Sequence, residues 1–183
     1  LREIRGGSWF VDHRKSTCQG IDGYPATNED QAFPDVGFRC CRGPILERKT
    51  FPKPNLECPK DMVSGSSFCI DQFEYPNTKG VMPQGGLTYQ QAKKYCEQKN
   101  KRLCAQSEWE EACQGLEGYR WPYGDTYEPN RCIDAGGNTM EGQSGSQPSG
   151  HAQGCVSSLG AYDMSGNVWE WTAEKILKGG GWN

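Results

Sequence analysis

Hydrophobic and polar side chains alternate along residues 67–75 in the manner of a β-strand. A shorter strand pattern covers residues 36–41, and an apolar and aromatic one covers residues 7–11. On the longest of these strands Asp71 and Glu74 would point to opposite faces, which argues against joint general acid and base catalysis by the two carboxylates. The pattern predicts three short strands.

Two helices are predicted from capping-box patterns followed by apolar residues at helical spacing. Thr88 has Gln91 three residues later, and Ser107 has Glu110 at the matching place, so each helix is expected to start at its hydroxyl residue. The residues that these helices would bury are Ala92, Tyr95 and Cys96 in the first and Trp109, Ala112 and Cys113 in the second.

The remaining polar stretches predict loops and a division of the chain. Residues 118–160 are dominated by Gly, Ser, Pro, Asn and Gln, so most of this stretch must be loop. Cys132 and Cys155 bracket its middle, and a disulfide between them would contribute about 3 kcal/mol in the chain-entropy account. Four prolines within residues 42–59 indicate an extended linker. We therefore expect three parts: residues 1–42, a linker over 43–57 and a body over 58–183.

Composition narrows the class of protein. Ten Cys, an even number, indicate disulfides and a secreted, cell-surface or periplasmic location. The net charge of −3 and the mixing of Lys and Arg with Asp and Glu argue against nucleic acid as a partner. Since no run approaches about 18 apolar residues, no membrane span is expected. Residues 1–5 are charged, so no signal peptide is predicted there, and we expect a mature form or a piece of a longer chain.

The sequence also contains one internal repeat. Ile4-Arg5-Gly6-Gly7-Ser8-Trp9 matches Leu177-Lys178-Gly179-Gly180-Gly181-Trp182, and the match is either a chance similarity of Gly-rich strings or the mark of a tandem array.

A calcium site is predicted around the Gly turn that precedes the aromatic residues Trp169 to Trp171. Carboxylates and bent backbone carbonyls form the oxygen-only ligand set that calcium favours, whereas the alternative is a solvated turn. The candidate ligands are the side chains of Asp163 and Glu170 and the backbone carbonyls of Gly166 and Val168.

Six motifs together point to a known family: Arg102-Leu103, Ser107-Glu108-Trp109-Glu110-Glu111-Ala112-Cys113, Trp121-Pro122-Tyr123-Gly124-Asp125, Tyr162-Asp163-Met164-Ser165-Gly166-Asn167-Val168-Trp169-Glu170-Trp171-Thr172, Arg5-Gly6-Gly7-Ser8-Trp9 and Gly37-Phe38-Arg39-Cys40. The chain resembles the sulfatase-modifying-factor family, whose fold is that of the formylglycine-generating enzyme, a variant of the C-type lectin-like architecture. The resemblance implies an α+β fold with two short helices, short twisted strands and much loop. It also supports the calcium site, because all four candidate positions match the family in type.

The order of the motifs departs from that of the family. The Gly-Gly-Ser-Trp and Gly-Phe-Arg-Cys strands come last in the family and first here, within residues 1–42. Either the chain is a circular permutant, or residues 1–42 end one family domain and the body begins another. Residues 1–42 could complete the body within the chain or from a neighbour. Residues 179–183 would then be surplus and could occupy the same strand position in the next unit, as a route to assembly.

A second departure concerns catalysis. The family's oxidase needs two Cys after the Gly-Gly-Ser-aromatic strand as copper(I) ligands, and those positions fall on Val11 and Ser16, which cannot bind copper. The resemblance implies Cys18–Cys113 and Cys40–Cys96 disulfides. Local proximity and elimination then suggest Cys58–Cys69, Cys132–Cys155 and Cys41–Cys104.

A site with three His ligands for iron, as in the sulfoxide-forming relatives, is excluded because the chain has only His13 and His151, each expected in a solvated loop. The resulting expectation is a non-catalytic, calcium-stabilised, disulfide-linked extracellular module. Its partner would be another copy of itself, an extracellular protein or a glycan. The alternative is a copper-dependent formylglycine-generating-type oxidase or a related enzyme of the family.

Overall fold

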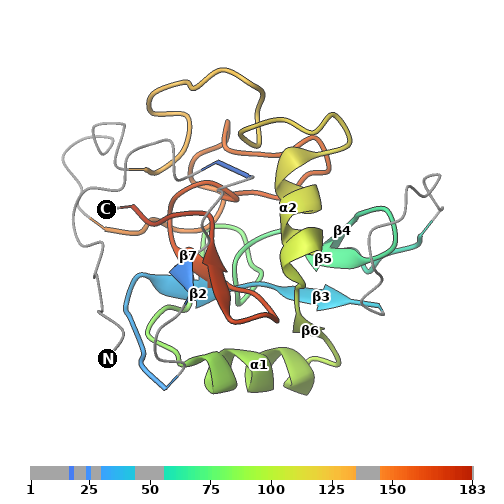
Figure 1. The fold of residues 1–183 in the computed structure, drawn as a ribbon, viewed down its shortest axis with the longest axis vertical. Helices are drawn as coiled ribbons and strands as arrows, with labels where there is room; N and C mark the ends of the chain where they lie inside the picture. The colour runs from blue at the N-terminus through green and yellow to red at the C-terminus, as the bar shows by residue number, and fades with distance from the viewer. Residues whose placement is uncertain (1–16, 19–23, 26–29, 44–55, 135–144, 183) are drawn as a thin grey trace.

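A computed structural model describes residues 17–18, 24–25, 30–43, 56–134 and 145–182. This part of the chain forms short helices and strands joined by long loops (Figure 1). The elements are β1 (Tyr24–Pro25), β2 (Val36–Phe38), β3 (Cys40–Arg42), β4 (Met62–Ser64), β5 (Cys69–Asp71), α1 (Tyr89–Gln98), β6 (Arg102–Leu103), α2 (Gln106–Gln114), β7 (Trp169–Trp171) and β8 (Ile176–Lys178).

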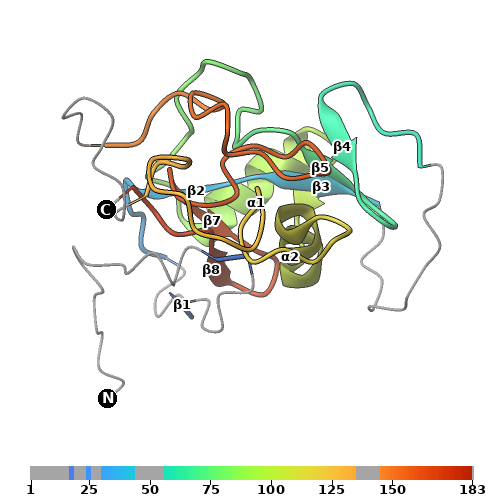
Figure 2. The same cartoon turned by 90° about the horizontal axis from the view of Figure 1, so that it is seen from above.

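The strands form two sheets, with the orders β1-β8-β7-β2 and β4-β5-β3-β6. Strands β2 and β7 are parallel and all other pairs are antiparallel. The chain passes from one sheet to the other at Arg39, so that β2 and β3 run on from each other across the middle of the molecule (Figure 2). The single strand expected over residues 36–41 is therefore two strands, because Phe38 pairs with Trp171 and Cys40 pairs with Leu103 in different sheets.

The strand expected over residues 67–75 is shorter than its pattern, because the chain turns after β5. The backbone N–H of Phe73 donates to Oδ1 of Asn77, and the backbone N–H of Asn77 donates to the carbonyl of Glu74. These bonds replace the ladder that a longer strand would need.

Both predicted helices are present, and the start of one differs from the prediction. Helix α1 has the expected capping box, in which Thr88 accepts from the N–H of Gln91 and the Gln91 side chain accepts from the N–H of Thr88. The expected start of α2 at Ser107 is wrong. Helix α2 begins at Gln106, because Glu108 rather than Glu110 reaches back and accepts from the N–H of Ala105, at 2.8 Å.

The buried faces of the helices agree with the prediction except at Tyr95. Trp109, Ala112 and Cys113 of α2 are fully buried, as are Ala92 and Cys96 of α1. Tyr95 stays 37 % exposed at the rim of the molecule. Helix α1 lies against β6, and α2 lies against β5 and β8 (Figure 1). The core therefore sits between the two helices and the two sheets, where Phe38, Phe68, Ile70 and Trp171 are also buried.

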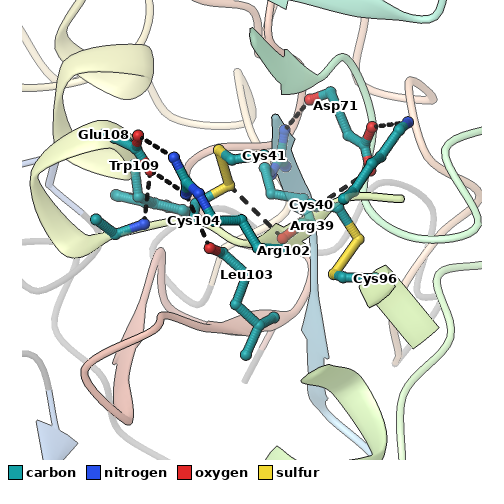
Figure 3. The surroundings of a disulfide bond; sticks show 12 residues. Arg39, Cys40, Cys41, Asp71, Cys96, Arg102, Leu103, Cys104, Glu108 and Trp109 are labelled. Carbon is teal, nitrogen blue, oxygen red and sulfur yellow. Dashed lines mark hydrogen bonds and ion pairs between the residues drawn. A yellow bond between two sulfur atoms is a disulfide. The ribbon is translucent and has the colours of Figure 1, made fainter. Parts of the chain in front are cut away.

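All five expected disulfides are formed, and they use all ten cysteines. Cys40 and Cys41 are neighbours in β3, and Figure 3 shows them bound to Cys96 and Cys104 on either side of the strand. The complete set is Cys18–Cys113, Cys40–Cys96, Cys41–Cys104, Cys58–Cys69 and Cys132–Cys155.

The expected division of the chain stays a prediction, although several of its parts can be located. Strands β1 to β3, from within residues 1–42, pair with strands of the body in both sheets. Residues 44–55 of the expected linker and the strand expected over residues 7–11 lie outside the described residues. The described residues include no helix that is long and apolar enough to cross a membrane.

Candidate functional site

Three of the four predicted calcium ligands, Asp163, Gly166 and Val168, lie in the buried turn that leads into β7, and Glu170 lies in β7 itself. Asp163 and Gly166 both have positive φ angles, of 56° and 79°, which bend the backbone as the sequence analysis required. Glycine is needed at position 166, because a Cβ atom there would overlap the carbonyl of Ile133. The N–H of Gly166 donates to the carbonyl of Gly179 at 2.8 Å. The turn is thus packed between two other segments and has one defined shape.

Glu170 is engaged by donors from two other elements. Nε and Nη2 of Arg39 donate to its two carboxylate oxygens at 2.7 and 2.6 Å, and the indole Nε1 of Trp109 donates to Oε2 at 2.9 Å. Arg39 is fully buried and Glu170 is 1 % exposed. Such a bidentate, charge-assisted pair fixes both distance and orientation.

The other donors of Arg39 connect further segments to this pair. Its Nη2 also donates to the carbonyl of Tyr162 at 2.9 Å, and its Nη1 donates to the carbonyl of Asp71 at 3.3 Å. Burial by itself lowers the pKa of Arg39, but Glu170 outweighs it and leaves that pKa raised. One guanidinium therefore joins the N-terminal strands to β5, to the turn before β7 and to β7 itself.

Two more buried carboxylates hold the loop that precedes the turn. Glu74, which is fully buried, accepts from Nδ2 of Asn167 at 2.9 and 3.0 Å and from the hydroxyl of Ser149 at 2.7 Å. Asp163 accepts from the N–H of Gly150 at 2.6 Å. The two carboxylates thereby fix residues 149–150 against the turn.

This cluster carries more negative than positive charge within the described part of the chain. Glu74, Asp163 and Glu170 are buried together around one guanidinium, that of Arg39. Burial, and then the neighbouring carboxylates, raise the pKa of Glu74 well above its ordinary value. Burial raises the pKa of Asp163 to about 6, although Gly150 and Arg39 act in the opposite direction. The cluster therefore favours the protonated form of Glu74.

The fit to calcium differs among the four predicted ligands. Asp163 and the carbonyls of Gly166 and Val168 belong to the required oxygen class, but Glu170 would have to share its carboxylate with Arg39. Among the described residues, no three His, Cys, Asp or Glu side chains gather in an arrangement that could hold a metal ion. The calcium site stays a prediction.

The other candidate residues are dispersed. Asp71 accepts from Nζ of Lys101 and from the N–H of Cys40, whereas Glu74 accepts from Ser149 and Asn167, so within the described part of the chain the two carboxylates share no hydrogen-bond donor. His151 is exposed. The copper-related positions Val11 and Ser16 lie outside the described residues, as does His13.

Sequence reasoning missed the central role of Arg39. Arg39 belongs to the Gly-Phe-Arg-Cys motif, and the sequence analysis predicts no role for it. A cation between Phe38 and Cys40, in a short predicted strand with apolar neighbours, was the available signal, because a charge that becomes buried needs a partner. Glu74 and Asn167 were missed in a similar way, since their partners lie about 75 to 93 residues away.

The sequence comparisons agree with this architecture. Residues 58–182 match the family described as sulfatase-modifying factor enzyme 1-like domain, and the chain belongs to this family. The α+β fold expected from the resemblance, with two short helices, short strands and much loop, is confirmed.

Curated relatives differ in what their names say of activity. The chain is 33 % identical over 112 residues to inactive C-alpha-formylglycine-generating enzyme 2 of Bos taurus, covering 52 % of this chain and 37 % of that protein. It is 32 % identical over 117 residues to the protein of the same name in Mus musculus, covering 55 % and 38 %. It is 31 % identical over 99 residues to hercynine oxygenase of Mycolicibacterium thermoresistibile, covering 51 % and 21 %. The chain thus spans less than two fifths of the length of these relatives.

Proposed function

We propose that the chain is a non-catalytic, calcium-stabilised module of an oxidising compartment, either secreted, on the cell surface or periplasmic. Its role is to bind a partner or to assemble with copies of itself. One observation supports the proposal that the module is non-catalytic. All ten cysteines are paired in disulfides, so the native chain has no thiolate to offer a copper(I) ion. The similarity to two proteins named as inactive supports the same view.

The disulfides also support the proposal that the chain belongs to an oxidising compartment. Five bonds in a chain of 183 residues form and persist where the glutathione and thioredoxin systems do not keep thiols reduced. Cys132–Cys155 closes the predicted loop region, and the other four bonds lie around the two helices and β3 to β5.

The excess of negative charge in the buried cluster supports the proposal that a calcium ion binds there. A divalent cation near Asp163 would offset negative charge that Arg39 alone does not balance, and burial away from water strengthens that attraction. The residues that would hold it are Asp163, Gly166, Val168 and Glu170, with Glu170 shared between the ion and Arg39. Its contribution would be structural, because the cluster organises the loop at residues 149–150.

Copper(I) titration combined with oxygen uptake tests the proposed function. We expect the wild-type chain to bind no copper tightly and to consume no oxygen above the buffer in the presence of a thiol-containing peptide. The matched comparison is the Val11→Cys/Ser16→Cys double variant, which places thiols at the two positions where the family's oxidase has them. Tight one-to-one copper binding by the wild-type chain would refute the proposal and favour the alternative, an oxidase or related enzyme of the family. The similarity to a protein named hercynine oxygenase keeps that alternative open to test.

A further inference from the structure

One of the five disulfides has a cysteine at the surface of the molecule. Nine of the ten cysteines are buried, each with at most 5 % of its surface exposed. Cys58 is the exception and is half-buried, whereas its partner Cys69 is 4 % exposed. A thiol in solution can therefore approach the Cys58–Cys69 bond from the side of Cys58 while the chain stays folded. The other four bonds are enclosed at both ends.

The register of the sheet places this disulfide on the face that points away from α2. Ile70 of β5 belongs to the same buried cluster as Trp109 of α2. Cys69 precedes Ile70 in the strand and so points to the opposite face. Its cross-strand neighbours are Arg42 in β3 and Ser64 in β4, the edge strand of this sheet (Figure 1). The bond therefore lies near the edge of the sheet, beside an exposed arginine.

The charges at the two ends of the bond differ. Paired residues of antiparallel strands present their side chains on the same face, so Arg42 lies beside Cys69. A neighbouring guanidinium stabilises a thiolate. At the other end, the exposed residues Glu57 and Lys60 flank Cys58 with opposite charges. Cys69 is therefore the better leaving thiolate, and Cys58 is the sulfur that is open to attack.

The chain beside Cys58 stays attached to the sheet when this bond opens. The two cysteines are 11 residues apart in the sequence, whereas the other pairs are 23 to 95 residues apart, so this bond contributes least in the chain-entropy account. The carbonyl of Asp61 accepts from the N–H of Gln72 at 3.3 Å and from Nδ2 of Asn77 at 2.7 Å. Strand β4 follows directly and pairs with β5 over three residues. We therefore expect the opened chain to keep its fold.

We propose that Cys58–Cys69 is a thiol-exchange site, at which a low-molecular-weight thiol of the glutathione class forms a reversible mixed disulfide with Cys58. The thiolate of the small molecule attacks Sγ of Cys58, the bond to Cys69 breaks, and Cys69 leaves as a thiolate. Cys69 then takes up the proton that the attacking thiol gave to the solvent. One disulfide and one thiol yield one disulfide and one thiol, so no further oxidant or reductant is needed. Attack by Cys69 on the mixed disulfide reverses the step.

The half-buried state of Cys58 favours a small thiol over the cysteine of a folded protein, which would need more room. The modification goes beyond the proposed function, because it requires neither calcium nor a protein partner. It gives the folded module a site that responds to the thiol content of its surroundings.

Mild thiol treatment of the full oxidised chain tests the site. The folded chain is incubated with reduced glutathione at neutral pH, the reaction is stopped with acid, and free thiols are blocked with a maleimide before peptide mass spectrometry. We expect glutathione on Cys58 and maleimide on Cys69. This pattern should be at least about ten times as frequent as modification of any other cysteine, because the enclosed bonds react only after the fold opens. The circular dichroism of the modified chain should equal that of the untreated chain.

Three variants serve as controls. The Cys58→Ser/Cys69→Ser double variant should form no glutathione adduct under the same conditions. Arg42→Gln should slow formation of the Cys58 adduct about threefold, as expected for loss of one exposed charge. The slowing should persist with uncharged 2-mercaptoethanol, which excludes attraction of the glutathione carboxylates as its cause. Lys60→Gln removes an exposed charge at the other end of the bond and should slow the reaction less.

Several results would overturn the proposal. These are equal modification of all five disulfides, absence of modification until the chain unfolds, and glutathione on Cys69 with maleimide on Cys58. Equal slowing by Arg42→Gln and Lys60→Gln would overturn the part given to Arg42. Copper titration of the untreated chain tests the proposed function by a separate measurement, so the two failures are distinguishable.

Discussion

Arg39 and Glu170 are 131 residues apart in the sequence and form a fully buried, bidentate ion pair between the two N-terminal strands and β7. The pair lies at the point where the chain passes from one sheet to the other. Glu170 is further held by Trp109 of α2, so a helix and both sheets meet at one carboxylate. Removing Arg39 leaves the charge of Glu170 buried with the indole N–H of Trp109 as its remaining side-chain donor.

We predict that Arg39→Met lowers the free energy of unfolding by about 3–5 kcal/mol, because Glu170 is then buried and uncompensated. Chemical denaturation with intact disulfides measures the change. Adding Glu170→Gln should restore part of the loss, since the double variant no longer buries the charge of Glu170 without Arg39. The control is Glu128→Gln, which breaks an exposed pair with Arg131 and should cost at most about 1 kcal/mol. Equal losses for Arg39→Met and Glu128→Gln would contradict the role given to the buried pair.

The sequence predicted local features better than it predicted distant ones. The capping box at Thr88 depends on residues three positions apart, and the Gly turn before β7 depends on local backbone preference, so both were accessible. The break at Arg39 depends on two partners, Trp171 and Leu103, which belong to different sheets. No local pattern encodes that choice of partner.

The disulfides and α2 are two further cases in which local sequence patterns do not determine the structure. Cys18–Cys113 and Cys40–Cys96 span 95 and 56 residues, and only the resemblance to a known family made them predictable. At α2 a plausible local signal was misleading. Glu108 serves as the capping residue because Arg102, from the preceding strand, binds its carboxylate at 2.6 and 2.7 Å and orients it.

The two hydroxyl residues at the predicted helix starts give a direct test of this difference. Thr88→Ala should lower the free energy of unfolding by about 1 kcal/mol, because the N–H of Gln91 loses its acceptor. Ser107→Ala should change it by less than about 0.5 kcal/mol, because Ser107 lies inside α2 and alanine favours a helix. Matched urea titrations of the two variants provide the comparison. A larger loss for Ser107→Ala would show that α2 is capped at Ser107 after all.

Lys101 is predicted to contribute to stability in a pH-dependent way. Its Nζ lies 2.6 Å from Oδ1 of the buried Asp71 and 3.0 Å from Oδ2 of Asp61. Burial lowers the pKa of Lys101, but the bonds to Asp71 and Asp61 more than compensate, so that the pKa is raised. A raised pKa means that the contribution is complete below the ordinary lysine value of about 10.4 and is lost as the pH rises through the folded-state pKa.

Lys101→Met should therefore destabilise the protein by about 1–3 kcal/mol at neutral pH, because the buried carboxylate of Asp71 loses a donor. The variant should also lose less stability than the wild type as the pH rises into the alkaline range. Burial raises the pKa of Asp71 too, despite the same ion pair. We assign the alkaline effect to Lys101, because a raised Asp71 pKa acts only in the acidic range. Lys93→Met, which removes an exposed pair 3.8 Å long with Glu97, is the control. Parallel pH profiles for the wild type and Lys101→Met would contradict the assignment.

Calcium removal tests the charge excess around Asp163. If calcium binds the folded chain alone, a concentration of a hundred times the dissociation constant stabilises it by about 2.7 kcal/mol. For a chain of this length, that corresponds to a rise in melting temperature of roughly 5–10 °C. Calorimetry in calcium and in EGTA, with magnesium as the control for ionic strength, measures the difference. Identical melting temperatures in calcium and in EGTA would refute the calcium site.

Asp163→Asn separates calcium binding from simple packing. Asparagine tolerates the positive φ angle of 56° at this position, and its carbonyl oxygen can still accept from Gly150. In EGTA we expect the variant to be as stable as the wild type or more stable, because a buried carboxylate with a raised pKa is replaced by a neutral group. In calcium it should be less stable than the wild type, because a ligand charge is lost. A destabilisation of the same size in both buffers would mean that Asp163 acts through its packing alone. A variant that is less stable than the wild type in calcium, but not in EGTA, identifies Asp163 as an ion-binding carboxylate.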